Sequence, residues 1–314
     1  MHTPSTTSPC ASPSFAPLQV LLTGATGFIG RAIAAALRRA GHTVHTGHSP
    51  NSPRQPHAGG VAMDFARDTD AATWLPRLQG IDAVVNAVGV LRDSAARPID
   101  AVHRDTPIAL FDACAQAGVQ RVVHISALGI DGSNTRYAQT KRAAEAHLQT
   151  LATQAKLRPA ILRPSVVYGK GGDSSALFMN LARLPLLMLP RAAVQARVQP
   201  VAVPDVAQAV LRLLQHGGPD IVTAVGPRAL TLAEYLGELR RQLGRGAATV
   251  IPLPDLPSRW SARVGDLVSA QPWSSEALSL LQQDNVGDAQ AFARVLGREP
   301  TPVEQFLAAA WNRA

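Results

Sequence analysis

The sequence predicts an α/β protein with a Rossmann-type, doubly wound parallel sheet, followed by a smaller, mostly helical C-terminal substrate region. Three observations support this fold class. Short apolar runs alternate with helical patterns between residue 18 and about residue 170, which is typical of βαβ units. The runs are apolar throughout, as expected of strands that are covered on both faces. A glycine-rich turn also joins the first apolar run to the first helical pattern.

The expected elements follow in order along the chain. Strands are expected at residues 18–23, 43–46, 61–63, 82–88, 121–126 and 160–163. Helices are expected at residues 28–40, 68–79, 99–117 and 137–154. After Gly169 the pattern loosens, and shorter helices are expected at residues 204–215, 230–243 and 288–296. One or both of the runs at residues 198–203 and 221–225 are expected to return to the main sheet as strands.

These patterns divide the chain into a tail at residues 1–17, a dinucleotide-binding domain at 18–170 and a substrate-side region at 171–314 that is intertwined with it. The tail is rich in Ser, Thr and Pro, lacks the pattern of a signal peptide, and is expected to be disordered. No apolar run is long enough to span a bilayer. The sequence carries no signal for a particular oligomeric state.

Charge and cysteine content limit the classes of partner. The formal net charge is +8, which can favour anionic ligands or membrane surfaces or can reflect a bias toward arginine. No run of Lys and Arg marks a nucleic-acid site, so none is expected. Cys10 and Cys114 lack the spacing of metal ligands, and neither a metal site nor a disulfide framework is expected. A reducing cytoplasm is the expected setting.

The turn between the first strand and the first helix has the form of a phosphate cradle. Gly24 permits a tight turn, Gly27 lets the backbone approach a pyrophosphate, and Gly30 lets the helix pack closely on the strand. The free N–H groups of the helix N-terminus then face the phosphates. The other residues expected to contact a dinucleotide here are Thr26, Phe28, Ile29 and Arg31.

The end of the second strand predicts which dinucleotide is bound. An NAD site usually has an acidic residue there to hold the ribose hydroxyls, and no acidic residue lies between Val44 and Met63. Arg31, Ser49 and Arg54 are placed to meet a 2′-phosphate instead, so NADP(H) is preferred. Alternatively these arginines are solvated, and NAD(H) is then bound as well. Asp64 either meets the adenine amino group or caps a helix.

A tyrosine and a lysine four residues apart begin the helix at 137–154. Tyr137 and Lys141 share one helix face, and an ammonium beside a phenol favours the phenolate and lowers the pKa of the phenol. Ser126 ends the preceding strand and brings a hydroxyl to the same edge of the sheet. The three residues suit a carbonyl whose oxygen Ser126 orients and to which Tyr137 supplies a proton.

These motifs together resemble the short-chain dehydrogenase/reductase superfamily, in its extended and atypical branches. The resemblance covers residues 18 to about 243 and also rests on the segments at 86–89, 162–169 and 200–207. It implies an NAD(P)-dependent oxidoreductase whose catalytic residues are Ser126, Tyr137 and Lys141. It also implies that the last two of these bind the cofactor, together with Asn86, Ala87, Val88, Gly89, Pro164 and Val166.

Within the superfamily the chain is most similar to the atypical group related to the NADPH-binding accessory subunit of respiratory complex I. This similarity rests on the run at residues 126–129, on His103 and on a late segment at 281–286. Three functions stay open: the set of Ser126, Tyr137 and Lys141 favours the first, the similarity to this group favours the second, and the overall length of the chain resembles that of the third. The first is an oxidoreductase acting on a carbonyl or alcohol of a small molecule. The second is a non-catalytic NADPH-binding assembly or redox-sensing protein, and the third is a nucleotide-sugar epimerase or dehydratase.

The substrate side contains a second unusual stretch. Residues 174–204 include no acidic residue, and Arg183 and Arg191 flank an apolar run that prolines interrupt. Such a stretch can receive a hydrophobic, quinone-like or isoprenoid-like substrate at an anionic membrane surface. Alternatively its leucines pack into the core and its arginines are solvated. The first alternative predicts a cytoplasmic protein that contacts the inner surface of a membrane peripherally.

Overall fold

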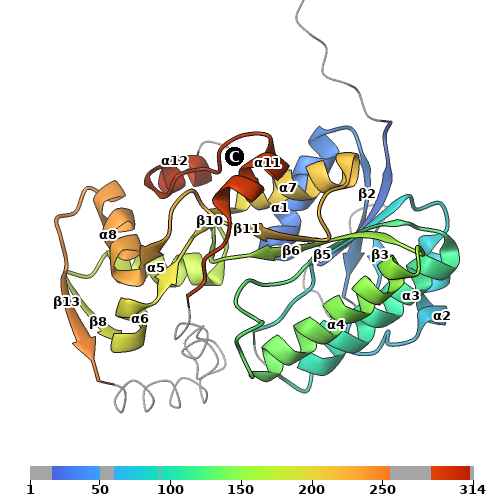
Figure 1. The fold of residues 1–314 in the computed structure, drawn as a ribbon, viewed down its shortest axis with the longest axis horizontal. Coiled ribbons are helices and arrows are strands. Elements are labelled where there is room, and N and C mark those ends of the chain that lie inside the picture. The colour runs from blue at the N-terminus through green and yellow to red at the C-terminus, as the bar shows by residue number, and fades with distance from the viewer. Residues whose placement is uncertain (1–15, 50–59, 92, 255–283, 312–314) are drawn as a thin grey trace, which may run out of the picture.

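The computed structural model describes residues 16–49, 60–91, 93–254 and 284–311. In this part of the chain seven strands form one parallel sheet with the order β3-β2-β1-β4-β5-β6-β11 (Figure 1). The strands are β1 (Gln19–Thr23), β2 (Thr43–His48), β3 (Val61–Ala62), β4 (Ala83–Asn86), β5 (Arg121–Ile125), β6 (Arg158–Pro164) and β11 (Ile221–Ala224).

Helices cover both faces of this sheet (Figure 1). On one face α1 (Phe28–Arg39), α7 (Val203–His216) and α11 (Ala289–Leu296) pack on the strands. The other face carries α2 (Ala71–Trp74), the 3-10 helix η1 (Leu75–Leu78), the π-helix η2 (Ala101–Asp105), α3 (Thr106–Ala117) and α4 (Arg136–Thr153). The predicted doubly wound Rossmann-type fold is therefore confirmed.

The order of the strands determines at which edge of the sheet a ligand is expected to bind. From β1 the chain winds outward to β3 and then returns to the other side of β1 as β4. In an open parallel sheet this reversal of direction opens a crevice at the carboxyl ends of the strands, where ligands bind. The predicted glycine turn after β1 and Ser126 after β5 both lie at this edge.

The C-terminal residues form a lobe with its own core and return α7, β11 and α11 to the main sheet. Its core includes Tyr168, Phe178, Tyr235 and Phe306. The remaining elements are β7 (Val167–Tyr168), α5 (Asp173–Ala182), β8 (Leu186–Pro190), α6 (Arg191–Gln195), β9 (Arg197–Val198), β10 (Val201–Ala202), β12 (Leu230–Thr231), α8 (Leu232–Gln242), β13 (Thr249–Leu253), η3 (Val303–Gln305) and α12 (Phe306–Trp311).

Several elements differ from their prediction, and three of the differences are the following. Of the two runs considered for the main sheet, only β11 joins it, because Pro200 divides residues 198–203 into two short strands that pair with β12 and β7. The helix expected from residue 68 begins at Ala71, since Asp70 caps it by accepting the Ala72 N–H at 2.9 Å. The helix expected from residue 99 starts as the π-helix η2.

Candidate active site

The turn after β1 has the geometry of a phosphate cradle. Gly24 has φ +73°, and a Cβ there would lie 2.6 Å from the Ala87 carbonyl oxygen. A Cβ on Gly30 would lie 2.0 Å from the Gly24 carbonyl oxygen, so only glycine fits at this crossing of helix and strand. Gly27 caps α1 without a side-chain hydrogen bond, and the first turn of α1 holds no acidic residue. The turn thus fits the pyrophosphate of a dinucleotide.

Two predicted cradle residues reach across to the loop that follows β7. The Phe28 ring lies on this loop, where a Cβ on Gly172 would be 2.8 Å from Phe28 Cε1. Arg31 Nη1 donates to the Thr26 carbonyl at 2.9 Å, and its Nη2 would be 2.7 Å from a Cβ on Gly171. These contacts join the cradle to the start of the C-terminal lobe. Ile29 packs partly into the main core.

Asn86, predicted to bind the cofactor, lies inside the sheet edge and is fully buried. Its Oδ1 accepts the Thr23 hydroxyl at 2.7 Å and the Val88 N–H at 3.3 Å. Its Nδ2 lies 3.2 Å from Nδ1 of His124. Asn86 therefore holds the ends of β1, β4 and β5 together and shapes the loop through Ala87 that borders the cradle.

Ser126 presents a buried hydroxyl without a partner among the described residues. The residue is 5% exposed, and its backbone N–H donates to the Leu162 carbonyl at 2.8 Å, which extends the β5–β6 pairing past the end of β5. The Pro164 carbonyl accepts the Leu128 N–H at 3.0 Å, and the Val166 carbonyl accepts the Val201 N–H at 2.9 Å. The backbone around Ser126 is thus held on both sides, while its Oγ remains available for a ligand.

Tyr137 and Lys141 lie one turn apart at the start of α4, as predicted. The Thr135 hydroxyl caps this helix by accepting the Ala138 N–H at 3.3 Å. The Tyr137 ring is half-buried and lies edge-on against the His103 ring, with 5.1 Å between centroids. The cap and this ring contact fix where the phenol leaves the helix.

Lys141 joins the cofactor loop to the end of β5. Its Nζ donates to the carbonyl of Ile125, the residue before Ser126, at 3.1 Å, and lies 3.7 Å from where a Cβ on Gly89 would be. The side chain is 3% exposed, and this burial lowers the pKa of Lys141 to about 8. The structure therefore brings Ser126, Lys141 and the loop at Gly89 together.

His103 has the contacts of a structural residue. Its Nε2 accepts the Val90 N–H at 2.9 Å, so Nδ1 carries the proton and faces the Thr140 hydroxyl at 3.4 Å. Burial lowers the pKa of His103 to about 2, and the ring stays neutral at physiological pH. A histidine at this position could either take part in a proton relay or hold neighbouring groups in place, and these contacts favour the second role. His103 orients the Tyr137 ring.

A buried ion pair beneath Lys141 was missed by sequence reasoning. Glu145, one turn after Lys141, is 2% exposed, and its Oε1 accepts from Arg163 Nε at 3.0 Å. Arg163 also donates from Nη1 to Asp131 at 2.6 Å. The Glu145 carboxylate raises the pKa of Lys141, opposing the larger effect of burial. Since Glu145 and Arg163 are eighteen residues apart, no local spacing marks them as a pair.

Asn285 is a second missed residue at the site. Its Nδ2 donates to the Leu128 carbonyl at 2.9 Å, two residues after Ser126, and its carbonyl accepts the Ser165 hydroxyl at 3.2 Å. Its Oδ1 is buried and has no partner among the described residues. The only signal in the sequence was the resemblance of residues 281–286, which assigns no contact.

At the ribose end of the site, the described residues at the end of β2 include no acid. This end consists of Gly47, His48 and Ser49, and Nδ1 of His48 is buried without a partner among the described residues. Arg54, predicted to meet a 2′-phosphate, lies outside the described residues. Asp64 forms a local turn by accepting the Ala66 N–H at 3.0 Å.

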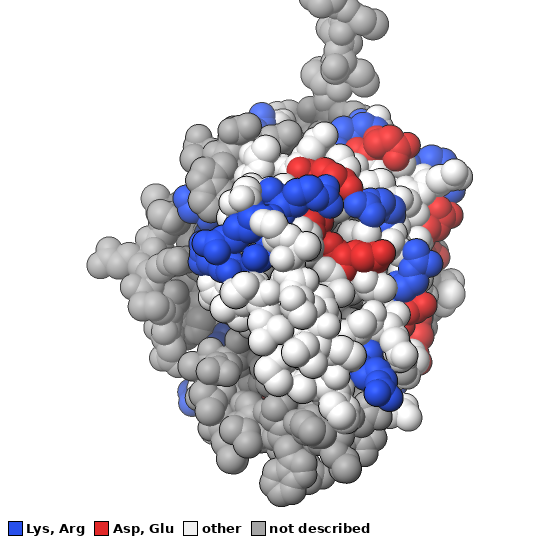
Figure 2. All heavy atoms as spheres, turned by 90° about the vertical axis from the view of Figure 1, so that its left-hand side faces the viewer, with Lys and Arg blue, Asp and Glu red and all other residues white. Residues whose placement is uncertain are grey.

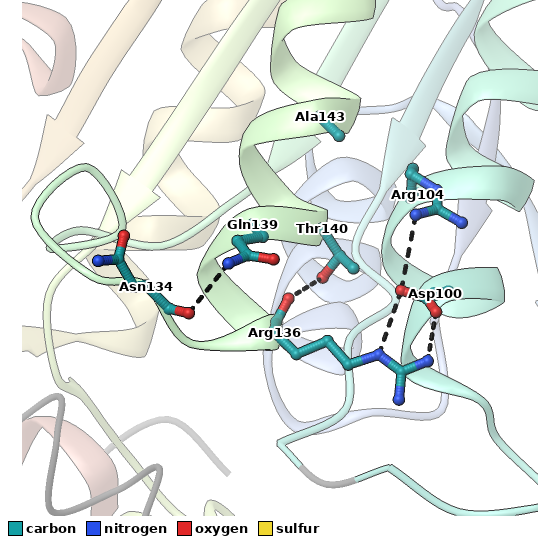
Figure 3. Close-up of a pocket in the computed structure, with 7 residues that line it drawn as sticks. All are labelled: Asp100, Arg104, Asn134, Arg136, Gln139, Thr140 and Ala143. Carbon is teal, nitrogen blue, oxygen red and sulfur yellow. Dashed lines mark hydrogen bonds and ion pairs between the residues drawn. The ribbon is translucent and has the colours of Figure 1, made fainter.

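A cavity of about 450 Å³ is lined by residues of α4 and η2 and of the segments that directly precede them (Figure 3). It contains none of Ser126, Tyr137 and Lys141. At its rim Arg136 donates to Asp93 at 2.7 Å and forms an ion pair with Asp100. These contacts fasten the start of α4, and thereby Tyr137, to the segment that precedes η2.

The arrangement defines an α/β protein that is built to hold a nicotinamide dinucleotide at one edge of its sheet. More particularly, the chain belongs to the NAD dependent epimerase/dehydratase family, whose model matches residues 20–226. Family members are NAD-dependent enzymes, which supports an enzymatic role for this chain.

Two curated relatives extend the similarity over most of the chain. The rat protein NADH dehydrogenase (ubiquinone) 1 alpha subcomplex subunit 9, mitochondrial, is 26% identical over 303 residues, covering 90% of this chain and 76% of the relative. Ceramide reductase of Caulobacter vibrioides is 27% identical over 263 residues, covering 82% of this chain and 78% of the relative. The predicted resemblance to the respiratory accessory subunit is therefore confirmed.

Solved structures confirm the fold. UDP-glucose 4-epimerase of Thermus thermophilus in complex with NAD superposes with a TM-score of 0.66 at 20% identity, covering 95% of this chain and 100% of the other. The Bordetella bronchiseptica enzyme WbmH in complex with NAD⁺ gives 0.69 at 19% identity, with 94% and 97% covered. In the described part of our chain, no helix has the length and apolar character needed to cross a bilayer.

Proposed function

We propose that this protein is an NADP(H)-preferring oxidoreductase that interconverts a carbonyl and an alcohol on a hydrophobic substrate. The observation that carries the proposal is the buried Ser126 hydroxyl, which has no partner among the described residues, together with the buried Lys141 ammonium that donates to the carbonyl of the preceding residue, Ile125. A buried hydroxyl without a partner is unfavourable unless a ligand supplies one. A substrate carbonyl oxygen is such a ligand.

The chain's own residues supply the binding and proton-transfer chemistry. Ser126 donates a hydrogen bond to the substrate oxygen and polarises the carbonyl. Tyr137 gives its phenolic proton to that oxygen as the alcohol forms, and the nearby Lys141 ammonium stabilises the phenolate that remains. A bound nicotinamide supplies the hydride in reduction and accepts it in oxidation. His103 holds the tyrosine ring, and Asn285 supports the loop that follows the serine.

The preference for NADP(H) is supported by the end of β2, where the described residues Gly47 to Ser49 carry no acid to repel a 2′-phosphate. Arg31 lies at the mouth of the cradle and adds positive charge there. The hydrophobic substrate is supported by the names of the two curated relatives, one a ceramide reductase and the other a subunit of NADH dehydrogenase (ubiquinone).

The test is NADPH oxidation by the full chain against long-chain ketones, ketone-bearing sphingoid lipids and quinones. Tyr137→Phe should cut turnover by roughly 10²–10⁴-fold while leaving NADPH affinity near that of the wild type. Tyr235→Phe is the matched control. It deletes a fully buried hydroxyl that has no partner among the described residues, and should keep full activity. Full turnover in Tyr137→Phe would overturn the assignment of the proton donor.

The similarity to the respiratory subunit favours a second candidate, a non-catalytic NADPH-binding assembly or redox-sensing protein. That function predicts NADPH binding without turnover on any carbonyl. A third candidate is a nucleotide-sugar epimerase, since UDP-glucose 4-epimerase of Vibrio cholerae is 26% identical over 199 residues, 56% of this chain. That function predicts interconversion of UDP-sugars without net consumption of NADPH.

A further inference from the structure

The C-terminal lobe exposes an apolar face on the two-stranded sheet of β8 and β13. Among the described residues, six large hydrophobic side chains are exposed, and four of them lie on this sheet or directly before it. They are Leu184, Leu186, Met188 and Ile251, which are 46%, 45%, 58% and 42% exposed. Scattered apolar side chains are normal on a surface, whereas a contiguous group indicates an interaction site.

The strand register holds these side chains on one face. The parallel pairing sets Leu186 opposite Thr249 and Met188 opposite Ile251. Since successive side chains of a strand point to opposite faces, the residues between them turn inward. Leu187 is 2% exposed and packs into the core of the lobe, as does Leu189. The outer face therefore cannot turn inward without exposing that core.

Arginines border this face, and acids are absent from both segments that build it. Residues 174–204 and 239–254 contain no Asp or Glu, and the β8–β13 pairing brings these two distant stretches together. Arg183, Arg191 and Arg245 are exposed, and none forms an ion pair with a described carboxylate. Arg245 Nη1 donates to the Arg183 carbonyl at 3.1 Å, so these two arginines lie side by side.

Figure 2 looks onto the end of the molecule that carries α8, β13 and β8. It shows a broad area without charge that is bordered on one side by a group of Lys and Arg side chains, with Asp and Glu side chains next to them. We call this surface the basic-apolar strip. It consists of Arg183, Leu184, Leu186, Met188, Arg191, Arg245 and Ile251.

We propose that the basic-apolar strip docks the protein on an anionic lipid surface. Apolar side chains flanked by arginines suit the boundary between acyl chains and acidic headgroups, where both kinds of group find partners. A second copy of this chain fits less well. A two-fold dimer would set the strip against itself and bring Arg183 and Arg245 close to the same arginines without an acid to pair with them.

Docking through the strip would place the lobe on the membrane with its core directly behind. Leu187 and Leu189 share that core with Tyr168, which ends β7 shortly after Val166 at the candidate site. The inference depends on the surface alone and stands whether or not the proposed reaction is correct.

The test is co-sedimentation of the full chain with vesicles of equal parts phosphatidylglycerol and phosphatidylcholine, beside vesicles of phosphatidylcholine alone. We expect binding to the anionic vesicles that weakens as salt shortens the screening length from about 10 Å at 0.1 M to about 3 Å at 1 M. Each arginine near an acidic surface strengthens partitioning about fivefold. Arg183→Glu with Arg245→Glu should therefore weaken it at least about 25-fold.

The matched control reverses the same number of charges elsewhere. Arg121 and Arg158 are exposed, adjacent at the amino edge of the sheet, and remote from the strip. Arg121→Glu with Arg158→Glu should retain vesicle binding. Leu186→Ser with Met188→Ser should weaken binding while keeping its salt dependence. Thermal unfolding of each variant establishes that it is folded.

Three results would overturn the inference. The first is that the wild type stays in the supernatant when it is mixed with anionic vesicles at low salt. The second is that Arg183→Glu with Arg245→Glu and Leu186→Ser with Met188→Ser both bind the vesicles as strongly as the wild type. Alternatively, light scattering can show a dimer that Leu186→Ser with Met188→Ser dissociates while vesicles bind no protein, which would assign the strip to self-association. Vesicle binding without carbonyl turnover would leave the inference intact and remove only the proposed reaction.

Discussion

Removal of the carboxylate beneath Lys141 should shift the pH range in which the lysine is cationic. The pKa of Lys141 is about 8, because burial lowers it more than Glu145 raises it. For two opposite charges about 6 Å apart, the interaction at an effective dielectric constant near 20 is about 3 kcal/mol. This energy corresponds to about two pH units. Since Arg163 already neutralises part of the Glu145 charge, we expect Glu145→Gln to lower the midpoint by about one pH unit.

The assay is NADPH affinity, measured by fluorescence titration between pH 6 and 10. The lysine is cationic below its pKa, so affinity should be highest there and should weaken as the pH rises through about 8 in the wild type. In Glu145→Gln the weakening should begin about one pH unit earlier. Asp131→Asn is the matched control, because it removes the exposed partner of Arg163 and leaves Glu145 in place. Equal midpoints in the wild type and Glu145→Gln would refute the electrostatic reasoning.

Three further predictions test the cradle, the cofactor preference and the burial of His103. Gly30→Ala sets a Cβ against the Gly24 carbonyl and should therefore reduce NADPH affinity at least about tenfold. Urea titration should show that it also lowers the free energy of unfolding by about 1–3 kcal/mol. Gly237→Ala is the control, because a Cβ at this position of α8 meets open space and should leave NADPH affinity unchanged. Calorimetric titration should show that the wild type binds NADPH at least about tenfold more tightly than NADH. Ser49→Asp should reduce this ratio of affinities, whereas Ser49→Asn should not. Equal affinities of the wild type for NADPH and NADH would contradict the predicted preference. Because the pKa of His103 is lowered to about 2, the unfolded chain takes up a proton below about pH 6.5 that the folded chain does not. Stability should therefore fall as the pH drops from 7 to 5, by up to about 1.4 kcal/mol per pH unit for this histidine, and a flat denaturation profile would contradict its burial.

The positions of the cradle glycines and of the proposed catalytic pair could be predicted from the sequence because their requirements are local. The glycine positions follow from the turn between one strand and one helix, and Tyr137 and Lys141 follow from the period of a single helix. Ser126 was found because strand ends in a parallel sheet meet at one edge. These sites need no knowledge of which distant segments come together.

The rest of the site depends on contacts between distant segments. Asn285 reaches the Leu128 carbonyl across 157 residues of sequence, and Glu145 meets Arg163 from a different element. The apolar run after Arg183 could be identified as unusual, but its strand partner β13 lies about sixty residues away and follows only from the packing of the lobe. Asn86 stays a predicted cofactor contact, and its buried bonds to the ends of the strands, which the sequence does not reveal, also make it a support for the loop.

The most direct test of the proposed function is transfer of deuterium from NADPH labelled at C4 of the nicotinamide to a hydrophobic ketone. The proposal predicts that mass spectrometry finds one deuterium on the carbinol carbon of the alcohol formed by the wild type. It predicts no labelled alcohol from Tyr137→Phe within the same time. Labelled alcohol formed equally fast by Tyr137→Phe, or tightly bound NADPH that yields no labelled alcohol from any ketone, would contradict the catalytic assignment of this site.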